Sequence, residues 1–316
     1  SAVSLAVRSA GEALPAALSR LAATDARLAA VGCRNGIGWE TAFSEARPDA
    51  FFDVGAEQNL VLTAAGLALG GRNVYAAANA ALLAGRGYDQ IRAAVAAPSL
   101  PVKLVGLEAG LSAGPEGAYR QMLEDVALMR ALPGVTVLVP ADYTSALALL
   151  ERAASSQGPV YIRLGSASAE DIYEEGDDAF FPGGGRVLRE GSGVTVCCCG
   201  IMVREALRAA EVLARQNISA EVIDCYSVAP LPARVILDSV HRTGCCVTAE
   251  EHLAGGGLGE AVAALTGDSY PVPVKPVAVF DKFGQSGAPQ ELREYYGLTA
   301  SQIVSEAMQV WIMRRR

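Results

Sequence analysis

The sequence predicts an α/β fold of two domains, each a mostly parallel sheet covered by helices. Along most of the 316 residues, short apolar runs rich in β-branched residues alternate with longer stretches of helical apolar spacing. Strands that alternate with helices pair in parallel and are buried on both faces. A segment rich in acidic residues and glycine at 169–185 interrupts the alternation. We therefore expect domains at 1–168 and 186–316, with 169–185 as the linker.

The composition supports a folded protein and narrows the range of partners. Apolar residues make up 51% of the chain, enough for buried cores. The net charge of −8 argues against nucleic acid as the main partner, because phosphate binding requires a basic face. No apolar run reaches the length of a membrane span. The sequence therefore predicts a cytoplasmic protein without a membrane partner.

The elements of the first domain follow in order from a helical pattern at 2–22, in which Pro15 predicts a break or kink. A strand at 28–32, a polar loop and a short helix from Trp39 come next. The remaining strands are expected, with helices between them, at 51–54, 73–77, 102–106, 135–139 and 160–163.

The second domain continues the alternation on a smaller scale. Strands are expected at 194–199, 220–228, 245–251 and 274–280, and helices at 201–215, 231–241, 256–265 and 301–311. The seven cysteines of the chain form no CxxC pair and lie mostly in these β-branched runs. Neighbours along a strand point to opposite faces, so adjacent cysteines do not readily chelate one metal. We interpret them as small buried hydrophobic residues in a reducing compartment.

The stretch FFDVGAEQNL at 51–60 carries the main candidate for chemistry. An aromatic run ends at Gly55 and gives way to helical spacing, which predicts a strand that turns into a helix with Glu57 in its first turn. The helix dipole favours a carboxylate there, at the carboxyl edge of a sheet where α/β proteins bind ligands. Taken alone, the pattern is explained better by a solvated glutamate at a helix start.

Five further motifs follow in a fixed order, and together with VGAEQN they resemble the pyrimidine-binding half of a thiamine diphosphate transketolase. They are RGYDQIR (86–92), PVKLVGLEAGLSAGPEG (101–117), QMLEDVALMR (121–130), PAD (140–142) and PVYIRLG (159–165). The later segments AEEHLAGGGLGEAV (249–262) and DKFGQSGAPQELREYYGLTA (281–300) are similar to the C-terminal domain of the same family. The resemblance covers nearly the whole chain and implies that family's fold.

The resemblance assigns cofactor-binding roles to four residues. In the family, a glutamate in a segment similar to VGIAEQN keeps a ring nitrogen of the aminopyrimidine protonated, so that the exocyclic imine can accept the thiazolium proton. Glu57 matches that catalytic glutamate, in a segment one residue shorter after Gly55. Asn79 and Leu82 take the places of two phenylalanines that cradle the pyrimidine, and Arg86 follows them. Aromatic stacking on the cofactor is therefore reduced.

The acceptor side departs further from the family pattern. Two family histidines correspond to Glu108 and Arg120, and Glu116 keeps the acidic residue before the second. The first histidine helps to hold a sugar phosphate, a dianion that a glutamate repels, whereas Arg163 matches a family arginine that contacts that phosphate. We expect all four as substrate-binding residues, and an unphosphorylated or cationic acceptor. A solvated pair of Glu116 with Arg120, and a surface ion pair for Arg163, stay open as alternatives.

The diphosphate and metal motif of this enzyme class, a GDG followed by an asparagine, has no counterpart in the sequence. The nearest strings begin at Gly176, in the linker, and at Gly267, in a late loop. The resemblance therefore implies the C-terminal subunit of a split transketolase that acts on a small sugar. The partner N-terminal subunit would bind the diphosphate with Mg²⁺ or Ca²⁺, so no metal ligand is expected on this chain, and the assembly would be α2β2. A 2-oxo acid dehydrogenase beta-type subunit and a catalytically silent, partner-binding scaffold remain alternatives.

Overall fold

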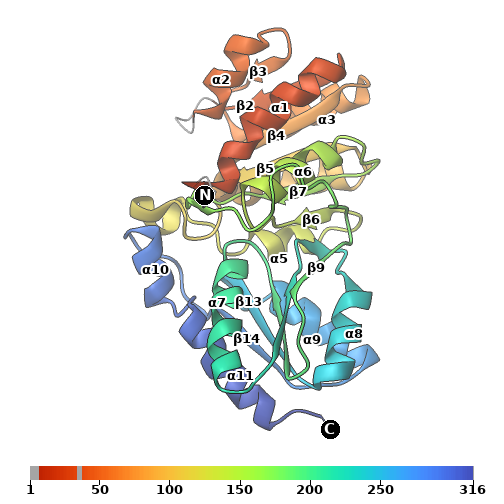
Figure 1. Ribbon diagram of the computed structural model, residues 1–316. Helices are drawn as coiled ribbons and strands as arrows, with labels where there is room; N and C mark the ends of the chain where they lie inside the picture. Colours follow the sequence, from red (N-terminus) through yellow and green to blue (C-terminus); the bar gives the residue numbers. More distant parts are fainter. Residues whose placement is uncertain (1–6, 34–37, 316) are drawn as a thin grey trace.

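The computed structural model describes residues 7–33 and 38–315, in which two helix-covered sheets lie one above the other (Figure 1). The larger sheet contains, among the described residues, β2 (Leu28–Gly32), β3 (Phe51–Asp53), β4 (Asn73–Asn79), β5 (Val102–Leu107), β6 (Thr136–Leu138), β7 (Val160–Arg163) and β12 (Ser227–Ala229). Their order is β12-β6-β7-β5-β4-β2-β3, and each pair is parallel except β12 with β6. This architecture confirms the predicted fold class.

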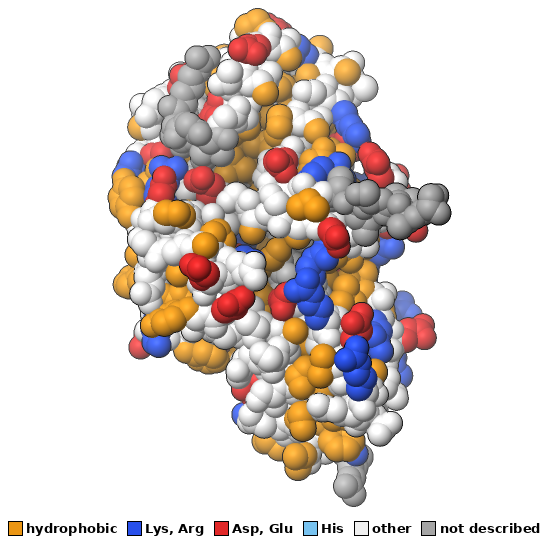
Figure 2. All heavy atoms as spheres, turned by 60° about the vertical axis from the view of Figure 1, so that its left-hand side comes forward, with side chains coloured by type: hydrophobic (Ala, Val, Ile, Leu, Met, Phe, Trp, Pro, Cys, Tyr) orange, Lys and Arg blue, Asp and Glu red, His pale blue; other side chains and the backbone are white. Residues whose placement is uncertain are grey.

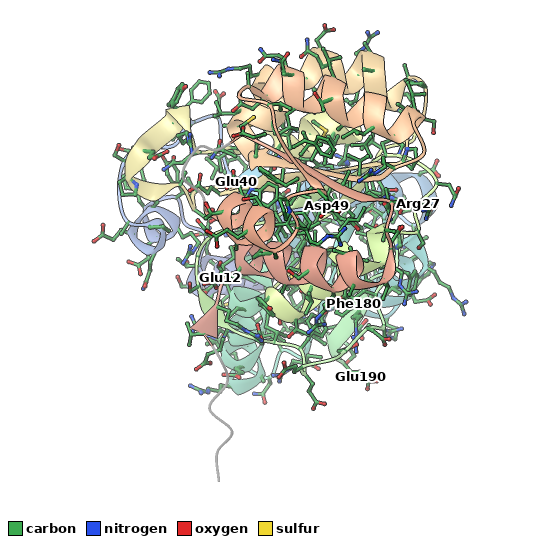
Figure 3. All side chains as sticks on the ribbon, turned by 90° about the horizontal axis from the view of Figure 1, so that it is seen from above. Glu12, Arg27, Glu40, Asp49, Phe180 and Glu190 are labelled. Atoms are coloured by element: carbon green, nitrogen blue, oxygen red, sulfur yellow. The ribbon has the colours of Figure 1, made fainter. Side chains whose placement is uncertain are left out.

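Helices cover both faces of the larger sheet, as the view from above shows (Figure 3). One face packs against α1 (Ala13–Thr24), α2 (Trp39–Ala46) and α6 (Tyr143–Ala153). The other packs against α3 (Glu57–Leu69), two π-helical segments, η2 (Ala81–Arg86) and η3 (Ile91–Ala96), and α5 (Asp125–Arg130). The central strands β2, β4 and β5 are buried almost throughout, as expected for strands that are covered on both sides.

The start of the chain corrects one expectation. The described part begins with β1 (Val7–Arg8) and the 3₁₀ turn η1 (Ala10–Glu12), and α1 then runs without a break to Thr24. Pro15 lies in the first turn of α1, where its missing N–H removes no intrahelical hydrogen bond. The predicted break at Pro15 is therefore wrong, and residues 2–6 of the predicted helix lie outside the described residues.

The smaller sheet has the order β14-β13-β10-β11-β9. Its strands are β9 (Arg186–Arg189), β10 (Val194–Cys198), β11 (Ala220–Asp224), β13 (Cys246–Leu253) and β14 (Val274–Val279). The helices of this half are α7 (Met202–Arg215), α8 (Ala233–Thr243), α9 (Leu258–Ser269), α10 (Pro289–Tyr295) and α11 (Ala300–Ile312). Neighbouring strands are parallel except for β9, which pairs antiparallel with β11 at the edge.

The stretch predicted as one strand at 220–228 serves both sheets. β11 stays in the smaller sheet, whereas β12 crosses over and pairs with β6, with Ser227 opposite Leu138. The backbone N–H of Val139 also donates to the carbonyl of Tyr226 at 2.7 Å. The assignment of 227–228 to the second sheet is therefore wrong, whereas the Cys225 N–H still donates to the Cys198 carbonyl of β10. Backbone hydrogen bonds thus join the two halves.

The glycine-rich segment at 169–185 is fastened to the folded halves. Its first strand, β8 (Ala169–Glu170), pairs antiparallel with β1. The Tyr173 hydroxyl donates to the Asp224 carboxylate at 2.7 Å, and the Phe180 ring packs edge-on against Tyr226 at 5.1 Å. The segment that connects the halves, residues 169–185, is therefore held against both of them, and we call it the strap.

All seven cysteines are buried and unpaired, in line with their interpretation as hydrophobic residues. The sulfur atoms of Cys197 and Cys246 lie 3.8 Å apart between β10 and β13. Burial raises the pKa of the Cys198 and Cys199 thiols, which disfavours the reactive thiolate. Within the described residues, no helix combines the length and apolarity needed to cross a membrane.

Candidate active site

Parallel strands of the larger sheet bring the predicted residues to one edge. Asn79 ends β4, Glu108 follows β5, Arg163 ends β7, and Glu57 begins the helix that follows β3. The carboxyl ends of parallel strands share one edge of a sheet, the edge at which α/β proteins bind ligands. The local order of strand, turn and helix thus assembles a candidate site from segments more than a hundred residues apart.

Glu57 is the first residue of α3, and only 4% of its surface is exposed. The turn before it depends on Gly55, whose φ of +73° places it in the left-handed region that favours glycine. Arg86 reaches the carboxylate from η2, with Nη1 3.3 Å from Glu57 Oε2. The same guanidinium donates to the Tyr119 hydroxyl at 3.3 Å, and this bond together with Glu57 raises the pKa of Arg86. The site therefore offers a buried carboxyl bordered by a partly exposed cation.

Asn79 is fully buried and connects the predicted cofactor-binding residues to the predicted substrate-binding residues. Its Oδ1 accepts from the backbone N–H groups of Ala81 and Leu82 at 3.1 and 3.4 Å. Its Nδ2 donates to Glu108 Oε2 at 2.9 Å and to the Arg120 carbonyl at 3.3 Å. Both ends of the amide are thus satisfied, as a buried polar group requires. Leu82 beside it is buried but belongs to neither of the two large hydrophobic clusters.

Arg120 lies between two carboxylates. Its Nη2 donates to Glu108 Oε2 at 3.2 Å, and its Nε lies 2.9 Å from Glu116 Oε2. Glu116 is the most exposed of the three, so its ion pair contributes little to stability. Glu108 has a φ of +53°, an uncommon conformation for a residue other than glycine. The structure brings all three predicted residues together, in a network with a net charge of −1.

Arg163 lies in the interior, so its interpretation as a surface ion pair is wrong. Its Nε lies 3.0 Å from both carboxylate oxygens of Asp125, and its Nη2 donates to the Met122 and Glu251 carbonyls at 3.1 and 2.9 Å. Burial alone lowers the pKa of Arg163, but the Asp125 and Glu251 carboxylates raise it overall. These contacts join β7 to α5 and to β13 of the other half. A contact between Arg163 and substrate remains a prediction.

Two residues at the site escaped the sequence analysis. Asp125 is fully buried and pairs with Arg163, and Gln121 bridges to the second domain. The signal for Asp125 was a carboxylate within the apolar run MLEDVALM, because a buried charge requires a partner. Gln121 gave no such signal, since a glutamine beside a loop is usually exposed.

Two family models match the chain. Residues 7–169 match the transketolase pyrimidine binding domain, and residues 183–303 match the transketolase C-terminal domain. The chain belongs to the transketolase family. The predicted family and its two kinds of domain are therefore confirmed, and membership implies dependence on thiamine diphosphate.

Some relatives of this transketolase chain are named as transketolase subunits. It is 42% identical over 269 residues to the 6-deoxy-6-sulfo-D-fructose transketolase subunit SqwH of Clostridium sp. (strain MSTE9), covering 85% of this chain and 83% of that protein. It is 32% identical to a subunit of the apulose-4-phosphate transketolase of Phocaeicola vulgatus, covering 84% and 86%. A solved structure described as a split gene transketolase, inactive beta4 tetramer, superposes with a TM-score of 0.92 at 40% identity, covering 98% and 100%. These similarities support the predicted transketolase subunit over a 2-oxo acid dehydrogenase subunit.

Proposed function

We propose that this chain is the subunit of a split transketolase that binds the aminopyrimidine of thiamine diphosphate and activates it through Glu57. The buried carboxyl of Glu57, at the start of α3 and at the carboxyl edge of the sheet, carries this proposal. Thiamine diphosphate, when bound, supplies the carbanion chemistry by which a two-carbon ketol unit passes from a ketose to an aldehyde or ketone acceptor. Glu57 would hold a proton on the ring nitrogen that faces it.

The residues around Glu57 fit a pyrimidine ring, with weaker stacking than a pair of aromatic rings would give. Leu82 is buried outside the main hydrophobic clusters and would present an apolar side chain to the ring. Arg86 would remain beside the Glu57 carboxyl, and Asn79 would border the ring while bound to Glu108. Each lost aromatic contact weakens binding by about 1 kcal/mol.

We further propose a partner N-terminal subunit that binds the cofactor's diphosphate with Mg²⁺ or Ca²⁺, in a cytoplasmic α2β2 assembly. The relatives named as subunits and the split gene neighbour support this division of labour. Helix α3 supports an interface as well, because it is apolar around its circumference yet exposes Leu62 and Leu69 by 50% and 74%. Among the described residues, no group of three or more His, Cys, Asp or Glu is arranged to hold a metal ion.

The acceptor of this transketolase is proposed to be unphosphorylated or cationic. Arg120 is already paired with Glu108 and Glu116, and Arg163 is engaged by Asp125. Both guanidinium groups are therefore already paired with carboxylates and do not offer a free cation to a phosphate group. The network of Glu108, Glu116 and Arg120 has one more carboxylate than cations, and this negative charge repels a phosphate dianion. Unphosphorylated sugars and cations meet no such repulsion.

The decisive experiment substitutes Glu57→Gln in the chain reconstituted with its partner subunit. The amide keeps the shape of the side chain but cannot share a proton with the ring nitrogen, so ketol transfer should fall by at least 100-fold. Glu211→Gln, on the exposed face of α7, is the matched control and should keep full activity. If the chain were a catalytically silent scaffold, Glu57→Gln would cause no change in activity.

The acceptor proposal is tested in the same assay. D-ribose should be a better acceptor than ribose 5-phosphate, and the reverse order would contradict the acceptor proposal.

A further inference from the structure

The second domain touches the loop that carries the acceptor residues. This acceptor loop, residues 108–121, follows β5 and contains the 3₁₀ segment η4 (Gly114–Tyr119). It lies beside the clamp segment, residues 281–288, which leads into α10. Figures 1 and 3 both show η4, in yellow, next to α10. On the face that Figure 2 shows, acidic and basic side chains are mixed with hydrophobic ones.

Gln121 makes the central contact between the acceptor loop and the clamp segment. It is only 5% exposed, and its Nε2 donates to the Gly114 carbonyl within the loop and to the Gln285 carbonyl across the interface, both at 2.9 Å. The two carbonyls fix the orientation of the amide, because a flipped amide would place its oxygen against two other oxygens. A β-carbon at Gly284 would lie 1.6 Å from Gln121 Oε1. The clamp segment therefore packs closely against the Gln121 side chain, with no room for a β-carbon at Gly284.

Three glycines of the acceptor loop lie close to residues of the second domain. Gly110, Gly114 and Gly117 all have positive φ, of 67°, 53° and 67°. A β-carbon on Gly117 would lie 3.0 Å from Ser286 Oγ, and one on Gly114 would lie 3.1 Å from the Gly287 carbonyl. A side chain at any of these positions would have a strained backbone conformation and would crowd the neighbouring domain. The loop is therefore shaped to lie on the second domain.

This contact reaches Arg120 through the backbone. The N–H groups of Arg120 and Gln121 both donate to the Gly117 carbonyl, at 3.1 and 3.0 Å. Since Gln121 is the next residue after Arg120, fixing its side chain restricts the direction in which the Arg120 side chain leaves the loop. Arg120 in turn holds Glu108 and Glu116. A shift of the clamp segment would therefore move all three acceptor residues.

We propose that Gln121 is a positioning residue through which the clamp segment of the second domain holds the acceptor loop in its productive conformation. The proposal rests on the proposed function for the role of the loop, and it gives the second domain a task in acceptor binding. Gln121 acts through Arg120 and Glu108 without touching the reacting atoms. Its loss should therefore weaken acceptor binding. It should leave the first step largely unchanged with hydroxypyruvate as donor, because that donor releases CO2 and places no aldehyde in the acceptor position.

Hydrogen exchange measured by mass spectrometry on the full chain tests the contact itself. Gln121→Ala removes two hydrogen bonds, so peptides covering 110–121 and 281–288 should both exchange at least tenfold faster. Gly284→Ala should open the same contact by steric conflict, but should add little in the Gln121→Ala background, where the conflicting atom is gone. Gln290→Ala is the matched control, because that exposed amide donates to Glu294 within α10. Unchanged exchange in Gln121→Ala, or independent effects of the two substitutions, would overturn the proposal.

Kinetics of the reconstituted pair then test the positioning role, with glycolaldehyde as the acceptor probe. Gln121→Ala should raise the KM for glycolaldehyde about tenfold, while the rate of hydroxypyruvate decarboxylation without acceptor changes less than twofold. Gln121→Glu should not rescue the KM, because it presents carboxylate oxygens to the two carbonyls. Equal losses in both steps would mean a general structural defect and contradict the proposal. Full activity of Glu57→Gln would instead refute the proposed function and leave the exchange result standing.

Discussion

At the scale of single residues, Asn79 shows how one substitution changes the chemistry of its neighbours. Asn79, which is predicted to stand where the family has a phenylalanine, offers no ring for stacking, and its amide provides a donor for Glu108. Glu108 in turn accepts from Arg120, and both are predicted to stand where the family has histidines. The three departures form one hydrogen-bonded network. We interpret them as a coordinated change of the pocket, because isolated losses would leave buried polar groups unpaired.

Arg163 allows a stability test of its structural role. Arg163→Met leaves the buried Asp125 carboxylate with the Tyr161 hydroxyl at 2.7 Å but without a cation, and should lower the free energy of unfolding by about 3–5 kcal/mol. The double variant Asp125→Asn with Arg163→Met should lose less, because no buried charge remains. Urea denaturation of the full chain measures both. Arg234→Met on exposed α8 should change stability by less than about 0.5 kcal/mol. Unaltered stability of Arg163→Met would indicate that the ion pair contributes nothing to folding.

The position of Glu57 could be predicted from the sequence, whereas the partners of Arg163 could not, because the first depends on a local pattern and the second on long-range contacts. Glu57 depends on a local pattern, a strand, a glycine in the left-handed region and a helix start, all within a few residues. The partner of Arg163 lies 38 residues away and becomes its neighbour only through sheet topology. Gln121 finds its partner even farther along the chain, at Gln285. Pairings across such distances leave no periodic trace in a single sequence.

At the scale of elements, helix α9 shows why a glycine cluster precedes a helix in this chain. The backbone N–H groups of Leu258 and Gly259 donate to the Glu250 carboxylate at 2.7 and 2.8 Å, so a side chain from β13 binds the helix N-terminus. A β-carbon at Gly257 would lie 2.1 Å from Glu250 Oε2. Glycine is required here by the close approach of strand and helix, since the φ of −86° suits any residue.

Two alanine substitutions in and beside α9 should therefore have opposite effects. Gly257→Ala displaces the Glu250 carboxylate from the helix N-terminus and should destabilise the chain by about 1–3 kcal/mol. Gly267→Ala, within the same helix and with no atom within 4 Å of its β-carbon, should stabilise by about 0.5–1 kcal/mol. Thermal unfolding of the two variants beside the parent chain measures the difference. A gain in stability from Gly257→Ala would show that the close approach is not required.

Element boundaries were predicted well where apolar periodicity was long and poorly where one strand changed sheets. Helices α7 and α11 begin and end within a residue or two of the predicted ranges, since their apolar faces extend over several turns. The stretch AEVIDCYSV at 220–228 was predicted as a single strand, and nothing in its spacing shows that β12 pairs with the larger sheet. The π-helical form of η2 and η3 also has no sequence signature, although η2 carries Leu82 and Arg86.

At the scale of the whole molecule, the strap that joins the two halves, residues 169–185, is bound to the buried carboxyl group of Asp224. Asp224 ends β11 and accepts from the Tyr173 hydroxyl, while Asp142 and Arg186 also face it. Burial raises the pKa of Asp224 to about 7, and the Asp142 carboxylate adds to this effect, whereas Tyr173 and Arg186 oppose it. We therefore expect the docking of the strap to depend on the protonation state of Asp224.

The sign of the resulting pH dependence follows from linkage. A carboxyl with a raised folded-state pKa contributes stability that is complete below its unfolded pKa of about 4 and is lost as the pH rises through about 7. The side chain in Asp224→Asn stays neutral. As the pH rises from 4 to 8, the free energy of unfolding of this variant should therefore increase by up to about 4 kcal/mol relative to that of the parent chain. Urea denaturation of both proteins across this range gives the difference curve. Glu250, with a pKa raised to about 7 by burial, and His252, with a pKa lowered to about 4 by burial, titrate in both proteins and cancel in the subtraction. A difference curve that stays flat from pH 4 to pH 8 would mean that the strap docks independently of the charge on Asp224.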